Sequence, residues 1–318
     1  MSDNAFLVTG ANTGLGKDAA RQLALRPEVT RIYLACRDAG RAAAAKADLE
    51  AITGRRVFDI LILVTAELRS VRAALSSIDT PLQGVLLNAG GAGGRTPMAH
   101  TADGVTTIFA SNVLGHVVLL EGLLDAQMLA STAVRVGSEV ARGVTALRLR
   151  RPRFATRSVD EFASVIDGTF FGGHRVDPML AYGQVKYLGA LGMSALARRH
   201  PDRRLLTVSP GNTWGTDGLR DVATVPRVIA QRVLMPYVAP VLGFSHPLEV
   251  GAKRLVDAVV GGPLRSGGFY ASRAKTLTGP LVDQSAIVAD FADTVTQDHA
   301  FEAIHYFLDR TRGKTTAD

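Results

Sequence analysis

The stretch LVTGANTGLGK, residues 7–17, decides the fold of this chain. An apolar run at residues 5–8 leads directly into Gly10, Gly14 and Gly16, and a helical pattern, KDAARQLAL, follows. Glycine permits a tight turn and a close approach of the backbone to a ligand, and the first turn of a helix presents N–H groups that suit a pyrophosphate. The stretch therefore predicts a strand–turn–helix unit that binds a nucleotide, although a glycine-rich turn without a ligand has the same pattern.

Outside this stretch, short apolar runs alternate with helical patterns. Such alternation is typical of a parallel sheet that helices cover on both faces. We expect one doubly wound α/β domain of the Rossmann type over residues 1–318, with about seven strands. Two segments interrupt the alternation: an insertion at 139–178, and a segment at 212–246. Besides the first, the expected strands lie at residues 31–37, 57–64, 84–90, 133–140, 204–211 and 267–272.

Composition excludes several classes of protein. The chain has 318 residues, a net charge of +7 and one cysteine, Cys36, so no intramolecular disulfide can form. No signal-peptide pattern opens the sequence, and we expect a cytoplasmic location. The histidines are scattered, so we expect no metal site.

Six arginines lie between Arg142 and Arg157. A solvated insertion loop is the favoured interpretation over a nucleic-acid or acidic-membrane patch, and we expect no nucleic-acid partner.

Functional residue types end several of the expected strands. Gly10, Arg37, Asn88, Ser138 and Pro210 all stand at such ends. Ligands of doubly wound sheets bind beyond the carboxyl ends of the strands, so these residues are expected to lie near one another.

The string AYGQVKYLG places Tyr182 and Lys186 four residues apart, on one face of an expected helix. A phenol titrates near pH ~10 in water. A neighbouring ammonium would lower its pKa and bring it closer to the range of a useful proton donor and acceptor.

Taken in order, these motifs resemble the short-chain dehydrogenase/reductase superfamily. The resemblance runs from Thr9-Gly10-x-x-x-Gly14-x-Gly16 through Asn88-Ala89-Gly90, Asn112, Ser138 and Tyr182-x-x-x-Lys186 to Pro210-Gly211. The strings YLACRD, TADG, NVLGH and VGS are most similar to the protochlorophyllide reductase and retinol dehydrogenase branches.

This resemblance implies four catalytic roles. Tyr182 would be the general acid in reduction or the base in oxidation, and Lys186 would lower its pKa and hold the nicotinamide ribose. Ser138 would hydrogen-bond the substrate carbonyl oxygen, and Asn112 would hold a water that relays protons. The cofactor site implied by the resemblance comprises Gly10, Asn12, Thr13, Gly14, Leu15, Gly16, Arg37, Asn88, Ala89, Gly90, Tyr182, Lys186, Pro210, Gly211 and Thr216.

NADP(H) is the expected cofactor rather than NAD. NAD enzymes of this type carry an acidic residue after the second strand to hold the ribose hydroxyls. Here Arg37 stands at that position, where a guanidinium can meet a 2′-phosphate, in a contact worth roughly 1.5 to 3 kcal/mol. The adjacent Asp38 keeps NAD as the alternative.

The expected reaction is hydride transfer between nicotinamide and a hydrophobic ketone, aldehyde or secondary alcohol. The 212–246 segment suggests the hydrophobic substrate, because it would form an apolar lid. Its side chains could instead pack on the core or another subunit, or make weak peripheral membrane contact.

Leu188 and Asn212 stand where protochlorophyllide reductases carry cysteines, which argues against light-driven pigment reduction. The alternatives are reduction of an activated C=C bond and a non-catalytic NADP-binding sensor. We expect a monomer or a homodimer.

Overall fold

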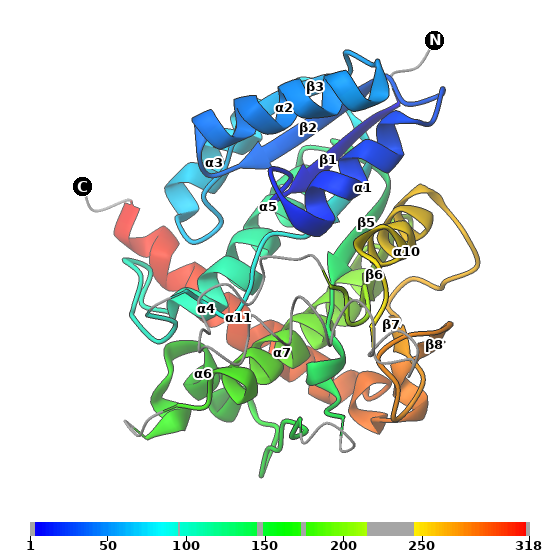
Figure 1. The fold of residues 1–318 in the computed structure, drawn as a ribbon. Coiled ribbons are helices and arrows are strands. Elements are labelled where there is room, and N and C mark those ends of the chain that lie inside the picture. Colours follow the sequence, from blue (N-terminus) through cyan, green and yellow to red (C-terminus); the bar gives the residue numbers. More distant parts are fainter. Residues whose placement is uncertain (1–3, 95, 145–148, 173–175, 215–244, 316–318) are drawn as a thin grey trace.

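A single sheet with the strand order β3-β2-β1-β4-β5-β6-β7-β8 forms the centre of the molecule (Figure 1). The computed structural model describes residues 4–94, 96–144, 149–172, 176–214 and 245–315. The first seven strands are parallel, and β8 pairs antiparallel with β7. The expected doubly wound fold is confirmed, with one more strand than the approximate seven, because the short edge strand β8 has too little apolar sequence to stand out. The strands are β1 Ala5–Thr9, β2 Arg31–Cys36, β3 Phe58–Ile62, β4 Leu82–Leu87, β5 Leu129–Val136, β6 Arg204–Val208, β7 Phe269–Ser272 and β8 Leu281–Asp283.

Helices cover both faces of this sheet. On one face α1 (Gly14–Ala24), α2 (Ala39–Thr53) and α10 (Leu248–Val260) pack on the strands. On the other face lie α3 (Leu68–Ser76), α5 (Gly115–Asp125) and α7 (Pro178–Arg199). Burial on both faces explains why the inner strands are continuous apolar runs.

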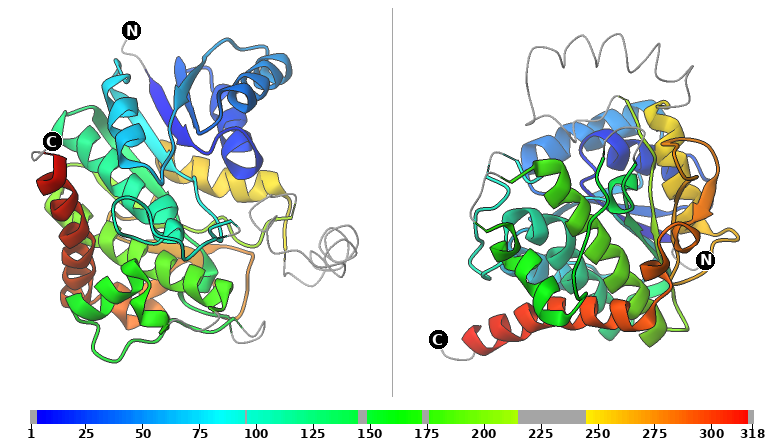
Figure 2. Two further views of the ribbon diagram at one scale, coloured as in Figure 1. Left: turned by 90° about the vertical axis from the view of Figure 1, so that its left-hand side faces the viewer. Right: turned by 90° about the horizontal axis from the view of Figure 1, so that it is seen from below.

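A further helix, α11 (Thr294–Thr315), lies along the outer side of α7 (Figure 2). It also contacts α6 (Val159–Asp167), so these helices form a third layer at this end of the molecule. The core under α11 is aromatic. The rings of Tyr187 and Phe291 lie 5.3 Å apart, and those of Phe269 and Phe291 lie 4.9 Å apart.

The described parts of the insertion at 139–178 pack against α7 and α11. The insertion contains the 3-10 turn η2 (Glu139–Ala141), helix α6 and the 3-10 turn η4 (Thr169–Phe171). Part of its arginine run is structural rather than solvated. Arg142 is buried and donates to the carbonyl oxygens of Ser272, Arg273 and Thr276. The expectation of a wholly solvated loop is therefore wrong for Arg142, whose side chain ties the insertion to the loop after β7.

The continuous helical segment that ends with α5 is apolar. Residues Thr107–Asp125 are long and apolar enough to cross a membrane, but 61% of the most apolar window is buried inside the protein. A segment buried to this extent packs in the protein as a core helix does. The expected lid at 212–246 lies outside the described residues except for 212–214 and 245–246.

Candidate active site

The order of the strands reverses between β1 and β4. In doubly wound sheets this switch point opens a crevice at the carboxyl ends of the strands, where ligands bind. The glycine turn follows β1, and Asn88-Ala89-Gly90 follows β4. The two motifs therefore flank the same crevice, as the strand-end pattern predicts.

The glycine turn allows a close approach of α1 to β1. Gly10 and Gly14 have φ angles of +66° and +54°, which favour glycine. A Cβ on Gly16 would lie 2.4 Å from the carbonyl oxygen of Gly10. No acidic residue lies in the first turn of α1, so the positive end of the helix dipole is not neutralised there. These features fit a pyrophosphate.

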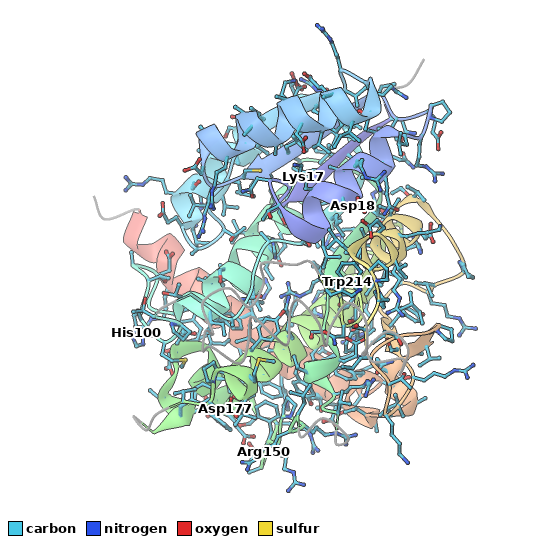
Figure 3. All side chains as sticks on the ribbon, in the orientation of Figure 1. Lys17, Asp18, His100, Arg150, Asp177 and Trp214 are labelled. Carbon is cyan, nitrogen blue, oxygen red and sulfur yellow. The ribbon has the colours of Figure 1, made fainter. Side chains whose placement is uncertain are left out.

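The charged side chains that follow this turn are engaged with neighbouring groups. Figure 3 labels Lys17 and Asp18 on α1. Lys17 forms an ion pair with Asp48 of α2. Asp18 accepts hydrogen bonds from Arg21 and Gln22, each at 2.7 Å. The Lys17–Asp48 pair joins α1 to α2, whereas the hydrogen bonds of Asp18 lie within α1.

Thr9 connects the two strand-end motifs. Its buried hydroxyl accepts hydrogen bonds from the N–H groups of Asn88 and Ala89 at 2.8 and 2.9 Å. The Asn88 amide in turn donates to the Thr9 carbonyl oxygen at 2.8 Å. Nε2 of His116, on α5, lies 3.0 Å from the same hydroxyl. Sequence reasoning treated Thr9 as part of a motif and not as the residue that joins these elements.

Asn112 lies in a π-helical turn, η1 (Ala110–Leu114), between α4 (Thr107–Phe109) and α5. Its side-chain amide donates to the carbonyl oxygen of Gly91 at 2.9 Å and accepts from the Gly91 N–H at 3.2 Å. A Cβ on Gly90, whose φ is +143°, would lie 2.3 Å from Oδ1 of Asn112. The Asn112 side chain thus has a structural role at the loop after β4, and π-helical turns are frequent at functional sites.

Helix α7 presents Tyr182 and Lys186 on one face. Asp177, labelled in Figure 3, caps the helix by accepting from the N–H of Met179 at 2.9 Å, and Pro178 occupies the first turn. The ammonium of Lys186 lies 5.4 Å from the centre of the Tyr182 ring. It also donates a 2.9 Å hydrogen bond to the carbonyl oxygen of Val136 at the end of β5.

Burial changes the pKa of both groups. Burial lowers the pKa of Lys186 to about 7, with a further contribution from the positive charge of Arg135. Burial raises the pKa of Tyr182 above its ordinary value, and the opposing contribution comes from Arg135. The expectation that Lys186 lowers the pKa of Tyr182 below its ordinary value is therefore wrong for this structure, because burial of the phenol outweighs the effect of neighbouring positive charge.

Ser138 begins the turn η2, and its hydroxyl accepts from the N–H of Val140 at 3.4 Å. This turn packs on α7 next to Tyr182, since a Cβ on Gly183 would lie 3.0 Å from the carbonyl oxygen of Val140. The following residue, Glu139, is buried. It accepts from the hydroxyls of Ser209 at 2.6 Å and Ser272 at 3.0 Å, which links the ends of β5, β6 and β7.

Arg37 is exposed at the end of β2. The neighbouring Asp38 caps α2, because its carboxylate accepts from the N–H of Arg41 at 2.8 Å. The carboxylate that would favour NAD is therefore engaged with the helix. The arrangement of Arg37 and Asp38 fits a 2′-phosphate.

The remaining predicted residues end β6. Gly211, with a φ of +79°, follows Pro210, and a Cβ on it would lie 2.5 Å from Nε2 of His246 and 2.6 Å from Nη1 of Arg254. His246 and the α10 residue Arg254 therefore pack closely on Gly211. Thr216 lies outside the described residues.

Two residues near Lys186 were missed by sequence reasoning. Arg135 is a buried charge within the apolar strand β5, and Gly189 lies on α7 directly against it. A single arginine between the apolar residues Ala133, Val134 and Val136 is the signal that could have identified the first. Gly189 has no distinguishing local signal, because its role depends on the side chain that packs against it.

Comparisons with known proteins agree with this geometry. Residues 4–145 match the family model of the short chain dehydrogenases. Retinol dehydrogenase 11 of Mus musculus is 37% identical over 122 residues, which cover 37% of this chain and 37% of that protein. Retinol dehydrogenase 12 of Bos taurus is 36% identical over 121 residues, with the same coverage. The matched segment thus spans well under half the length of these relatives.

Two solved structures share the fold over most of the chain. Salutaridine reductase from Papaver somniferum has a TM-score of 0.60 at 16% identity, covering 84% of this chain and 99% of its own. L-sorbose reductase from Gluconobacter frateurii, solved with NADPH and L-sorbose, has a TM-score of 0.59 at 16% identity, covering 87% and 97%. The family-model match covers residues 4–145 and the retinol dehydrogenases are similar to a segment of about the same length, whereas the two solved structures show that the fold is shared over most of the chain.

Proposed function

We propose that the protein is an NADP(H)-dependent oxidoreductase that transfers hydride between nicotinamide and a hydrophobic ketone, aldehyde or secondary alcohol. One observation carries the proposal. Tyr182 and Lys186 share a face of α7, beside the turn that begins at Ser138, at the same sheet edge as a glycine turn built for a pyrophosphate. An arrangement of this kind suits proton transfer next to a bound dinucleotide.

Each side chain has one task in the proposed reduction. A bound nicotinamide supplies the hydride. The Ser138 hydroxyl donates a hydrogen bond to the substrate carbonyl oxygen, which gains negative charge as the C–H bond forms. The Tyr182 hydroxyl gives its proton to that oxygen, leaving a phenolate that is reprotonated before the next turnover. Lys186 holds the cofactor ribose, and Asn112 supports the route by which protons return. In oxidation the Tyr182 phenolate accepts the alcohol proton.

The preference for NADP(H) rests on Arg37 and Asp38. The Arg37 guanidinium is exposed beyond β2, and the Asp38 carboxylate is engaged in capping α2. Chicken fatty liver carbonyl reductase, solved with NADPH, and the L-sorbose reductase share the fold and bind this cofactor. A guanidinium–phosphate contact of roughly 1.5 to 3 kcal/mol would give about ten- to hundredfold preference for NADPH.

The hydrophobic substrate class is proposed from the sequence of the 212–246 segment and from the retinol dehydrogenases among the relatives. The probes are therefore all-trans-retinal and long-chain aldehydes and ketones, each with NADPH, followed by loss of absorbance at 340 nm and by product chromatography. Tyr182→Phe should lower kcat/KM by about 10²- to 10⁴-fold. The exposed tyrosine in Tyr306→Phe provides the matched control.

Other outcomes would replace the proposal. A product that keeps its carbonyl group would show reduction of an activated C=C bond. NADPH binding without turnover of any substrate, together with normal cellular activity of the Tyr182→Phe variant, would show a cofactor-binding sensor.

A cytoplasmic location and a monomeric or homodimeric state are further proposals. Sedimentation equilibrium would test the second. Sedimentation with anionic vesicles, compared with zwitterionic vesicles, would test weak membrane contact.

A further inference from the structure

An arginine lies inside the core next to the candidate active site. Arg135 follows the buried Val134 in β5, and only 3% of its surface is exposed. A guanidinium is costly to bury unless charged or polar partners surround it. Its presence in the buried part of the strand, where Arg135 is the one charged residue, therefore requires an explanation.

Two elements hold the guanidinium in place. Its Nη2 donates to the main-chain carbonyl oxygen of Asn112, in the π-helical turn. It also lies flat against α7, because a Cβ on Gly189 would lie 2.4 Å from Nη2. Tyr182, Lys186 and Gly189 stand at positions i, i+4 and i+7 of that helix, so they share one face. Arg135 thus joins the Asn112 turn to the helix face that carries the tyrosine and the lysine.

The groups around Arg135 do not neutralise it. Among the described residues, no carboxylate forms an ion pair with it, and its Nε has no hydrogen-bond partner. Glu139 is bonded to serine hydroxyls, and Glu121 is bonded to His305 at 2.8 Å. Arg135 and this second pair border the same small cavity of about 20 Å³, together with the buried His116.

We propose that Arg135 is a positioning residue of the candidate active site: a second buried cation that fixes the Asn112 carbonyl group and, with Lys186, stabilises the ionised form of Tyr182. The inference that Arg135 stabilises ionised Tyr182 rests on the proposed function. The inference that Arg135 acts on Lys186 is independent of that function.

The electrostatics of the three groups agree with this role. Burial lowers the pKa of Arg135 to about 10, so it stays charged at neutral pH. Its charge disfavours the protonated form of Lys186 and favours the phenolate of Tyr182. His116 does not share this role, because burial, with help from Arg135, lowers its pKa to about 3 and leaves it neutral.

The first test needs no turnover. The chain has only six lysines, so ¹³C-lysine labelling gives a simple NMR spectrum, and the Lys186→Met variant assigns the Lys186 signal. Arg135→Met should raise the Lys186 pKa by about one pH unit, and Arg135→Lys should leave it near the wild-type value. Arg204→Met is the matched control, because Arg204 donates to the carbonyl oxygens of Ala258 and Leu264 elsewhere on the sheet. An unchanged Lys186 pKa in folded Arg135→Met would overturn the proposal.

Should Arg135→Met fail to fold, Gly189→Ala displaces the guanidinium instead. Its control is Gly192→Ala on the same helix, where the added Cβ would meet only the flexible end of Ile304 at 2.8 Å. The Lys186 pKa should change in the first variant and stay constant in the second. Equal behaviour of the two variants contradicts the inference.

The second test uses alcohol oxidation with NADP⁺. In Arg135→Met the pH at which kcat/KM rises should move upward, because the phenolate loses a neighbouring cation, and Arg135→Lys should restore it. A loss of rate that is the same at every pH would show a merely structural role and would contradict the proposal. If no substrate turns over but the NMR shift occurs, the proposed function fails while the placement of Arg135 beside Lys186 stands.

Discussion

The main-chain N–H of Asn88 donates a 2.8 Å hydrogen bond to the hydroxyl of Thr9, across 79 residues of sequence. The N–H of Ala89 donates to the same oxygen at 2.9 Å, and Nε2 of His116 lies 3.0 Å away. One buried hydroxyl therefore connects the end of β1 to the loop after β4 and to helix α5.

Replacing this hydroxyl by a methyl group should destabilise the fold. Thr9→Val leaves the half-buried N–H of Ala89 without its acceptor, while that of Asn88 keeps the Leu86 carbonyl oxygen at 3.0 Å, so we expect the free energy of unfolding to fall by about 1 to 2 kcal/mol. Urea denaturation measures the change. Thr207→Val is the matched control, because the Thr207 hydroxyl is buried without a hydrogen-bond partner among the described residues. It should be neutral or slightly stabilising. Equal losses in both variants would argue against the role of Thr9.

Adding a methyl group to the glycine turn should impair cofactor binding. The Cβ of Gly16→Ala would lie 2.4 Å from the Gly10 carbonyl oxygen, so α1 must move away from the turn. We expect at least a roughly tenfold weaker Kd for NADPH, by fluorescence titration, since this corresponds to only about 1.4 kcal/mol. In Gly40→Ala the Cβ has space, with its nearest contact at 3.5 Å. That variant should bind NADPH normally and be as stable as the wild type or more so.

Removing the guanidinium after β2 should change cofactor preference. Arg37→Ala should lower kcat/KM for NADPH by about ten- to hundredfold and leave that for NADH nearly constant, because only NADPH carries the 2′-phosphate. Arg41→Ala, an exposed arginine in the first turn of α2, is the control. Unchanged kinetics with both cofactors in Arg37→Ala would rule out Arg37 as the phosphate ligand.

Buried His116 should make the fold sensitive to acid. Burial lowers its pKa from 6.5 to about 3, so between these values the unfolded chain binds a proton that the folded protein does not. The free energy of unfolding should therefore fall as pH falls from 6.5 towards 3, by up to about 1.4 kcal/mol per pH unit from this group. His116→Gln should reduce this slope, measured by denaturation at several pH values. The exposed histidine in His100→Gln should leave the slope as in the wild type.

Local sequence was sufficient for features set by neighbouring residues. Apolar runs predicted the parallel strands, since a strand buried on both faces needs apolar side chains throughout. The spacing of Gly10, Gly14 and Gly16 predicted the turn, because positive φ angles and close backbone contact favour glycine. The order of the motifs likewise indicated the resemblance to the short chain dehydrogenases, whose family model matches residues 4–145.

Tertiary structure decided the features that depend on contacts between distant elements. Thr9 is an ordinary strand residue until the fold brings the loop after β4 and His116 to its hydroxyl. Asp38 could serve the cofactor or the helix, and the direction of α2 gives its carboxylate to the N–H of Arg41.

The positions of Tyr182 and Lys186 on the helix follow from local sequence, whereas their pKa values follow from tertiary structure. The spacing of Tyr182 and Lys186 determined that they share a helix face, because the helical repeat fixes this by itself. Their pKa values depend on burial and on Arg135, which stands on another element about fifty residues earlier and reaches α7 only because Gly189 leaves room for it. Desolvation and charge act through space, so only the folded chain determines them.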